Sequence, residues 1–155
     1  MGRITDRLAG LDITLPPRVP PAPDHAVLVR SGALVFLSSH GPLDAERRPV
    51  YRGRLGAELD EEEGHAAARL CALNVLATLA DEVGDLDRIE RVVRFTGYVN
   101  AVPEFERHPW VMNGASEVFV DVFGERGAHA RSAIGVTGLP LGMACAIETI
   151  FEVSG

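Results

Sequence analysis

The sequence predicts an α+β domain in which two helices pack on one face of a single β-sheet. Three observations support this prediction. Short apolar runs rich in β-branched residues lie near the start of the chain and again at its end, as expected for strands. A long stretch with helical periodicity, residues 60–83, lies between them. A second helical stretch, residues 114–123, separates a long strand from the last two strands.

Composition limits the class of protein. The 155 residues suffice for one domain with a substantial core. The contents of 46% hydrophobic and 24% charged residues are typical of a globular protein. A net charge of −7 argues against a nucleic-acid-binding surface. All fifteen basic residues are arginines, which excludes a Schiff base formed by a lysine side chain.

The sequence shows no targeting or membrane-spanning segment. Residues 1–9 carry charges, and no apolar run approaches the length needed to cross a bilayer. We therefore expect a cytoplasmic protein with no membrane contact. Cys71 and Cys145 make no disulfide framework, and the five histidines lack metal-ligand spacing. We expect no metal and no organic cofactor.

Residues 1–23 are expected to form an N-terminal arm ahead of the domain proper, residues 24–155. Apolar residues at helical spacing near the start, Ile4 and Leu8, predict a short amphipathic helix. The five prolines within residues 15–23 exclude a helix and predict an extended segment leading into the first strand.

The first strands are expected at residues 27–30 and 33–38. Between them, Ser31-Gly32 predicts a hairpin turn, because glycine readily adopts positive φ. A short third strand is expected over residues 50–55.

The longest helix is expected over residues 60–83. Asp60 can cap its first turn, and Glu63 is the reciprocal partner three residues later. Gly84 follows the last apolar position, where glycine commonly ends a helix.

Residues 86–101 are expected to form a long strand in which Val93 lies on the apolar face. The second helix, residues 114–123, is expected to begin after an Asn113 cap and to end at Gly124.

The final stretch predicts two strands, residues 131–136 and 144–153, joined by a Gly- and Pro-rich turn. Arg131 shares a strand face with the small residues Ala133 and Gly135, which leave space beside its guanidinium. A guanidinium offers a planar fork of donors that matches a carboxylate. The alternative is that Arg131 lies over the sheet edge with its head in water.

Polar groups suited to chemistry occur at the strand ends, where binding sites usually form. They are His25, Ser39, His40, Arg131 and Glu148. No GxSxG, Walker A, GxGxxG or HExxH pattern is present. A Ser39–His40–Asp44 triad can be drawn, but such close sequence neighbours rarely reach triad geometry.

Several segments resemble the RidA/YjgF family. Its closing signature is similar to Ala130-Arg131-Ser132, then Leu139-Pro140-Leu141-Gly142, then Ile147-Glu148. Residues 31–42, 67–79 and 92–100 resemble earlier family segments in the same order, so the resemblance covers roughly residues 20–153. The stretches His108-Pro109 and Asn113-Gly114-Ala115 resemble a less-studied branch of the family.

This resemblance implies a chorismate-mutase-like fold with a mixed sheet, assembled as a homotrimer with clefts between subunits. It implies that Arg131 grips the carboxylate of a small metabolite, helped by backbone amides at Ser39 and Ala133. The active members hydrolyse reactive enamines and imines, such as 2-aminoacrylate, to 2-keto acids and ammonia. The family is often labelled endoribonuclease.

The sequence departs from the deaminating members at several positions. Ala146 replaces a Glu that helps to position the attacking water, and Glu148 matches the neighbouring, more structural Glu. His25 replaces a Tyr near the first strand, and His40 replaces a Gln-like position. His40 is either an acid–base group near neutral pH or a loop histidine exposed to solvent, and the sequence leaves both open. Cys145 is expected to face the core, opposite Ala146.

The resulting expectation is an imine deaminase in which Arg131 and His40 act on the substrate while His25 and Glu148 contact it. A bound water is the alternative to His40 as the group that moves protons. Three other functions remain open: a non-catalytic carboxylate-binding module, an endoribonuclease, or an enzyme that tautomerises or cyclises an imine. The charge of −7 and the absence of lysine weaken the endoribonuclease, because phosphate contacts need a basic surface.

Overall fold

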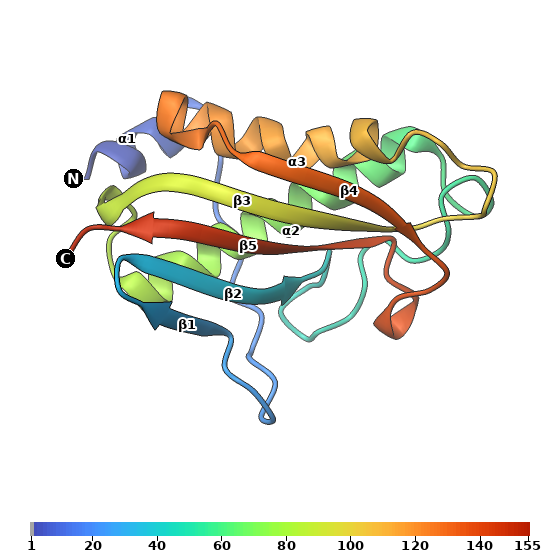
Figure 1. Ribbon diagram of the computed structural model, residues 1–155, viewed down its shortest axis with the longest axis horizontal. Helices are drawn as coiled ribbons and strands as arrows, with labels where there is room; N and C mark the ends of the chain where they lie inside the picture. The colour runs from blue at the N-terminus through green and yellow to red at the C-terminus, as the bar shows by residue number, and fades with distance from the viewer. Residues whose placement is uncertain (1) are drawn as a thin grey trace.

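The computed structural model describes residues 2–155 and shows a two-layer α+β arrangement (Figure 1). Within these residues, one mixed five-stranded sheet has the order β1-β2-β5-β3-β4. The strands are β1 (Leu28–Ser31), β2 (Leu34–His40), β3 (Ile89–Asn100), β4 (Ala130–Val136) and β5 (Cys145–Val153). The α-helices are α1 (Arg3–Gly10), α2 (Glu61–Val83) and α3 (His108–Phe123). Helices α2 and α3 lie along the same face of the sheet, which confirms the predicted fold class.

Helix α2 forms the centre of the helical layer. Its start is fixed by a capping box in which Asp60 and Glu63 each accept a hydrogen bond from the other's backbone N–H, both at 2.8 Å. Gly84, at φ 85°, ends it as predicted. All residues from Cys71 to Leu79 are buried, because the sheet covers one side of the helix and α3 another.

Helix α3 begins at His108, six residues earlier than the sequence predicted. The physical reason is Pro109, which lies in the first turn of the helix. Backbone N–H groups in this turn make no hydrogen bond within the helix, so a proline, which lacks the N–H, costs none there. Asn113 is therefore not a cap but lies inside the helix. Gly114 lets α3 approach α2 closely, because a Cβ at this position would come within 2.1 Å of the His65 carbonyl oxygen.

Strands β4 and β5 are consecutive in the chain but are not neighbours in the sheet. Strand β3 lies between them and pairs parallel with β4 and antiparallel with β5. The predicted hairpin of β1 and β2 is confirmed, with Gly32 at φ 62°. The predicted strand over residues 50–55 is wrong, because Gly53 at φ 128° breaks the extended backbone and leaves isolated bridges only.

The two faces of the sheet differ in character. The helix-facing side carries Phe95 and Phe151, and each ring forms an edge-to-face pair with Phe119 of α3. A register shift between Val92 and Arg94 places Val92 in the core in place of the predicted Val93. The opposite face is not covered by helices, and it exposes the large apolar side chains Val29, Phe36 and Ile134.

Cys145 faces the core, as predicted, and lies there beside Cys71. Both are fully buried, and their Sγ atoms are 3.7 Å apart, between α2 and β5. Burial raises the pKa of the Cys71 thiol well above its usual range. These residues are therefore packing groups and not exposed nucleophiles.

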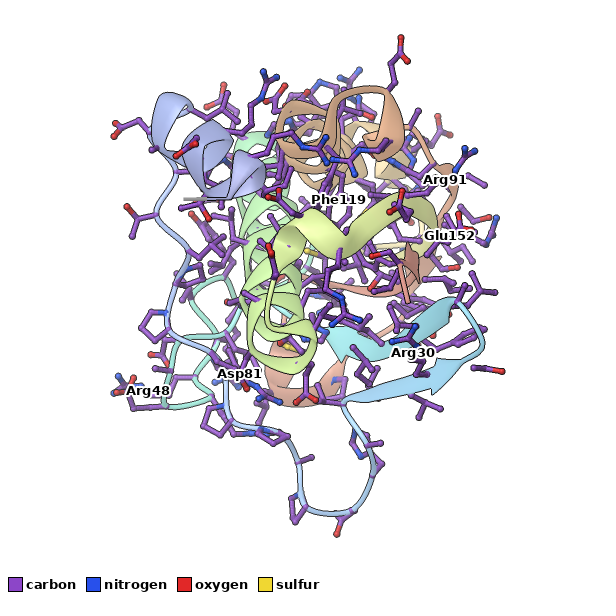
Figure 2. All side chains as sticks on the ribbon, turned by 90° about the vertical axis from the view of Figure 1, so that its left-hand side faces the viewer. Arg30, Arg48, Asp81, Arg91, Phe119 and Glu152 are labelled. Atoms are coloured by element: carbon purple, nitrogen blue, oxygen red, sulfur yellow. The ribbon has the colours of Figure 1, made fainter. Side chains whose placement is uncertain are left out.

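The N-terminal segment packs against the body of the molecule. Helix α1 buries Ile4 and Leu8, and the carboxylate of Asp87 accepts hydrogen bonds from its first backbone N–H groups. Residues 11–27, here called the strap, then pass the end of α2 and lead into β1 (Figure 2). Arg18 of the strap forms ion pairs with Asp81 and Glu82 at that end.

Candidate functional site

A cavity of about 550 Å³ lies at the end of β2, where the strap passes. Four of the residues that the sequence singled out line it: His25, Ser39, His40 and Glu148. Apolar groups of the strap and of the turn before β5 complete the walls, namely Val19, Pro20, Pro21, Ala22, Pro140, Leu141 and Met143. The cavity is therefore mostly apolar with a few polar groups, as is usual for small-molecule sites.

His40 is the last residue of β2 and is buried, with 8% exposure. This excludes the solvent-exposed loop histidine. Its Nδ1 lies 2.8 Å from the Ser38 carbonyl oxygen, and its Nε2 lies 2.8 Å from Oγ1 of Thr78 in α2. Burial lowers the pKa of His40, opposed by the Ser38 carbonyl and reinforced by the charge of Arg18. The ring is therefore neutral at pH 7, donating from Nδ1 and accepting at Nε2.

Asn74 is a cavity residue that the sequence analysis missed. Its Nδ2 donates to the carbonyl oxygens of Gly41 and Leu43, both at 3.0 Å, and so fixes the loop after β2. Its Oδ1 is buried and has no hydrogen-bond partner among the described residues. The signal for it was an asparagine inside an otherwise apolar helical stretch, where a buried amide requires partners.

Glu148 and Ala146 lie side by side in β5 on the face that the helices leave open. Glu148 is exposed and accepts a 2.5 Å hydrogen bond from the hydroxyl of Tyr98. This hydrogen bond is the main cause of the raised pKa of Tyr98. Ala146 is paired with Tyr98 across the sheet and provides no carboxylate. Glu148 is the one acidic residue among the described residues that line the cavity.

Arg131 and Ala133 lie at the opposite edge of the sheet, in β4. As predicted, they share a face, and this face is turned toward α3. Nη1 of Arg131 donates to Oδ1 of Asn113 at 2.8 Å and to Oγ of Ser116 at 3.1 Å. The side chain is half-buried and is held on α3, so the alternative of an arginine fully in water is wrong.

One chain does not bring Arg131 together with the cavity. Strands β5 and β3 lie between β2 and β4, so β2 and β4 are three strand spacings apart, roughly 14 Å. Within a single copy, the site residues predicted from the sequence therefore fall into two separate groups. Arg131 and Ala133 lie in β4, and His25, Ser39, His40 and Glu148 line the cavity.

Other site types find little support within residues 2–155. No three His, Cys, Asp or Glu side chains of this range are grouped to hold a metal ion. None of its helices is long and apolar enough to cross a membrane. The triad drawn on paper is not formed, because the Asp44 carboxylate binds Arg48 and two backbone N–H groups of its own loop.

Comparison with known proteins identifies the family. Residues 26–153 match the family described as "YjgF/chorismate mutase-like, putative endoribonuclease". The chain belongs to the YjgF family. The resemblance inferred from the residues is thereby confirmed, and so is the YjgF/chorismate-mutase-like α+β fold.

Relatives of this YjgF protein span nearly its whole length. Protein TCP17 of Trypanosoma cruzi is 40% identical over 154 residues, covering 99% of this chain and 96% of its own. The crystal structure of Atu1372 from Agrobacterium tumefaciens, of unknown function, has a TM-score of 0.89 at 36% identity, covering 98% and 94% of the chains. A crystal structure from Shewanella oneidensis, described as "a putative endoribonuclease", has a TM-score of 0.92 at 29% identity, covering 98% and 100% of the chains.

Proposed function

We propose that the protein is an imine and enamine deaminase that acts at clefts between the subunits of a homotrimer. Its substrates are 2-aminoacrylate-type intermediates, and its products are 2-keto acids and ammonia. The observation that supports this proposal is the separation, within one chain, of Arg131 and Ala133 in β4 from the cavity at the end of β2. A ring of copies that places β4 of one subunit beside the cavity of the next would unite them.

The carboxylate anchor of this site is Arg131. Asn113 and Ser116 occupy Nη1, whereas the hydrogen bonds found among residues 2–155 use neither Nε nor Nη2. That edge of the guanidinium carries two parallel N–H donors, which suit the two oxygens of a carboxylate. Backbone N–H groups at Ala133 and, from the neighbouring copy, at Ser39 would complete the contact. E. coli TdcF, which shares the fold with a TM-score of 0.59 at 22% identity, was solved with bound serine, itself a small carboxylate.

The chemical step needs little machinery because the substrate is already reactive. An enamine such as 2-aminoacrylate first tautomerises to the imine, when its methylene carbon gains a proton and its nitrogen loses one. Water then adds through its oxygen to the imine carbon, its protons pass to the nitrogen, and the C–N bond breaks to release ammonia as the carbonyl forms. Glu148 is the carboxylate available beside the cavity to orient this water, since Ala146 cannot. Buried, neutral His40 holds the cavity wall through Thr78 and Ser38, so a bound water is the proton carrier that we favour over His40.

The test is ammonia release from 2-aminoacrylate, generated in situ from serine by a pyridoxal-dependent dehydratase. Wild-type protein is expected to accelerate ammonia and pyruvate formation over the spontaneous reaction. Arg131→Ala is expected to lose roughly 100-fold in kcat/KM, because charge-assisted hydrogen bonds contribute about 1.5–3 kcal/mol each. Arg69→Ala, which removes an exposed arginine from the surface of α2, is the matched control. Decay of 2-aminoacrylate at the same rate with and without protein would refute the proposal.

A second candidate function is a non-catalytic carboxylate-binding module, which Ala146 favours because the usual water-positioning carboxylate is missing. Tight binding of 2-oxobutanoate without turnover of any imine, abolished by Arg131→Ala, would select this function. The endoribonuclease of the family description is less well supported, because the chain carries a net charge of −7. RNA that stays intact with rigorously nuclease-free protein would remove it.

A further inference from the structure

Arg131 carries its charge without an acidic partner. Every ion pair found among residues 2–155 uses another arginine or His65, and none includes Arg131. Burial lowers the pKa of its guanidinium, but an arginine remains protonated in proteins. A half-buried cation held only by neutral groups keeps its charge available for an incoming anion.

Two neutral side chains of α3 determine how this guanidinium is oriented. Nη1 has two hydrogens, and the carbonyl oxygen of Asn113 and the hydroxyl oxygen of Ser116 accept one each. Because the guanidinium is planar, fixing both hydrogens of Nη1 also fixes the direction of the Nε–Nη2 edge. The rotation of the fork is therefore restricted before a ligand arrives.

His129 sets the direction of the hydrogen bonds in this cluster. Its Nδ1 lies 2.6 Å from the carbonyl oxygen of Gly127, which can only accept, so Nδ1 carries the ring proton. Its Nε2 accepts from the Ser116 hydroxyl at 2.9 Å. The Ser116 hydroxyl consequently donates its one hydrogen to His129 and accepts from Arg131 through a lone pair. The chain of donors runs from Arg131 to Ser116, then to His129, then to Gly127.

The surroundings of His129 favour this neutral form. The rings of Phe95 and Phe119 flank it, with centroids 4.9 and 6.0 Å away. Burial lowers its pKa, the Gly127 carbonyl opposes this, and the charge of Arg131 lowers it further. Arg126, the other arginine close to His129 in the sequence, lies in the short turn before β4 and donates to the Ile89 carbonyl. It is not among the causes of this pKa shift.

We propose that Asn113, Ser116 and His129 are positioning residues that hold Nη1 of Arg131 and so present its Nε–Nη2 edge, with its charge uncompensated, to the substrate carboxylate. The inference rests on the proposed function, in which Arg131 is the anchor. It explains what Asn113 does inside α3 instead of capping it. An aspartate there would hold the arginine equally well but would compete with the substrate.

The first experiment separates positioning from simple structural support. Ser116→Ala is expected to weaken binding of 2-oxobutanoate, the probe acid, by about tenfold, because one hydrogen bond to a charged group is lost. Asn113→Asp is expected to weaken it more, while the melting temperature stays the same or rises. If Asn113 had a purely structural role, Asn113→Asp would leave the affinity for 2-oxobutanoate unchanged. Ser116→Thr, which keeps the hydroxyl, is expected to bind 2-oxobutanoate with the affinity of the wild type.

The matched control is Ser132→Ala. Ser132 is the next residue in β4 and also accepts from an arginine, Nη2 of Arg94 at 2.7 Å, but on the opposite face of the sheet. It is expected to leave the affinity for 2-oxobutanoate unchanged. Wild-type affinity in both Ser116→Ala and Asn113→Asp would overturn the inference.

A second measurement needs no ligand. In ¹⁵N spectra, the ring of His129 is expected to show the Nδ1–H tautomer, and the guanidinium of Arg131 is expected to rotate slowly about its Cζ–Nη1 bond. Ser116→Ala is expected to release that rotation, whereas Ser132→Ala is not. Unchanged rotation in Ser116→Ala would overturn the inference. If wild-type protein binds no 2-oxo acid, the proposed function fails, and these spectra alone decide whether the three residues orient Arg131.

Discussion

Two histidines of this chain, His40 and His129, are held in hydrogen-bond chains that suit the neutral ring, and burial lowers the pKa of both. Each donates from Nδ1 to a backbone carbonyl two residues earlier and accepts a hydroxyl hydrogen at Nε2. The sequence Ser-Ser-His-Gly-Pro left open whether His40 is an acid–base group or an exposed loop histidine, because its partner Thr78 is 38 residues away and belongs to another element. A local pattern contains no information about such a partner, so burial of His40 could not be predicted.

The buried His40 predicts a pH dependence of stability. Its pKa is lower in the folded state than in the unfolded chain, where a histidine titrates near 6.5. Below that pH the unfolded state binds more protons, so the free energy of unfolding falls as the pH decreases toward the folded-state pKa. His40 contributes at most about 1.4 kcal/mol per pH unit in this window.

His40→Gln replaces the ring by a neutral amide that does not titrate. Urea unfolding between pH 7.5 and 5 is expected to show a smaller loss of stability in this variant than in wild type. If the free energy of unfolding changed equally with pH in the two proteins, protonation of His40 in the folded state would not reduce stability.

At the scale of single elements, the sequence predicted those whose signals are local. The Asp60–Glu63 capping box and Gly84 fixed both ends of α2, and alternation placed Arg131 and Ala133 on one face of β4. The start of α3 was missed because asparagine, as at position 113, commonly caps a helix and proline, as at position 109, commonly lies in a loop. In the structure, Pro109 lies in the first turn of α3, and the helix packs on α2.

The strap is an element whose position depends on a few polar contacts. Arg18 joins it to Asp81 and Glu82, and Nη1 of Arg47 donates to the Pro20 carbonyl at 2.7 Å. Arg18→Ala is expected to cost only about 1 kcal/mol of global stability, because the pairs are partly exposed. It is expected to loosen the cavity wall, seen as faster hydrogen exchange in residues 11–27.

Arg48→Ala is the control for the strap. Arg48 also pairs with two carboxylates, Asp44 and Glu46, but within its own exposed loop (Figure 2). Its removal is expected to leave hydrogen exchange of the strap unchanged. Equal protection of residues 11–27 in Arg18→Ala and wild type would show that apolar contacts alone hold the strap.

For the whole molecule, the sequence suggested the fold class but not the distribution of the site. Reading along the chain places Arg131 a short turn from Glu148, whereas the sheet inserts β3 between their strands. The separation follows from strand order, a non-local property that alternation and turn signals do not encode. It leaves the predicted site residues in two separate groups on one subunit, which the proposed homotrimer would unite.

Phe36 lies on this open face and is 41% exposed. Phe36→Glu is expected to convert the proposed trimer to monomers, because burying an unpaired carboxylate in an apolar interface is costly. Deaminase activity is expected to disappear with it, since Arg131 and the cavity no longer meet. Light scattering and the ammonia assay measure the two effects on the same sample.

Val120→Glu is the control for this experiment, since Val120 is 44% exposed but lies on α3, in the helical layer. Its trimer and activity are expected to persist. A wild-type protein that is monomeric and fully active would contradict the proposed assembly.

The position of β5 in the sheet has a consequence for biosynthesis. It pairs with both β2 and β3, although it follows every other strand in the chain. During translation, the β1–β2 hairpin and β3 therefore emerge from the ribosome long before the strand that joins them. Their edges stay unpaired for that interval, which makes the nascent chain vulnerable to aggregation and a natural client for chaperones.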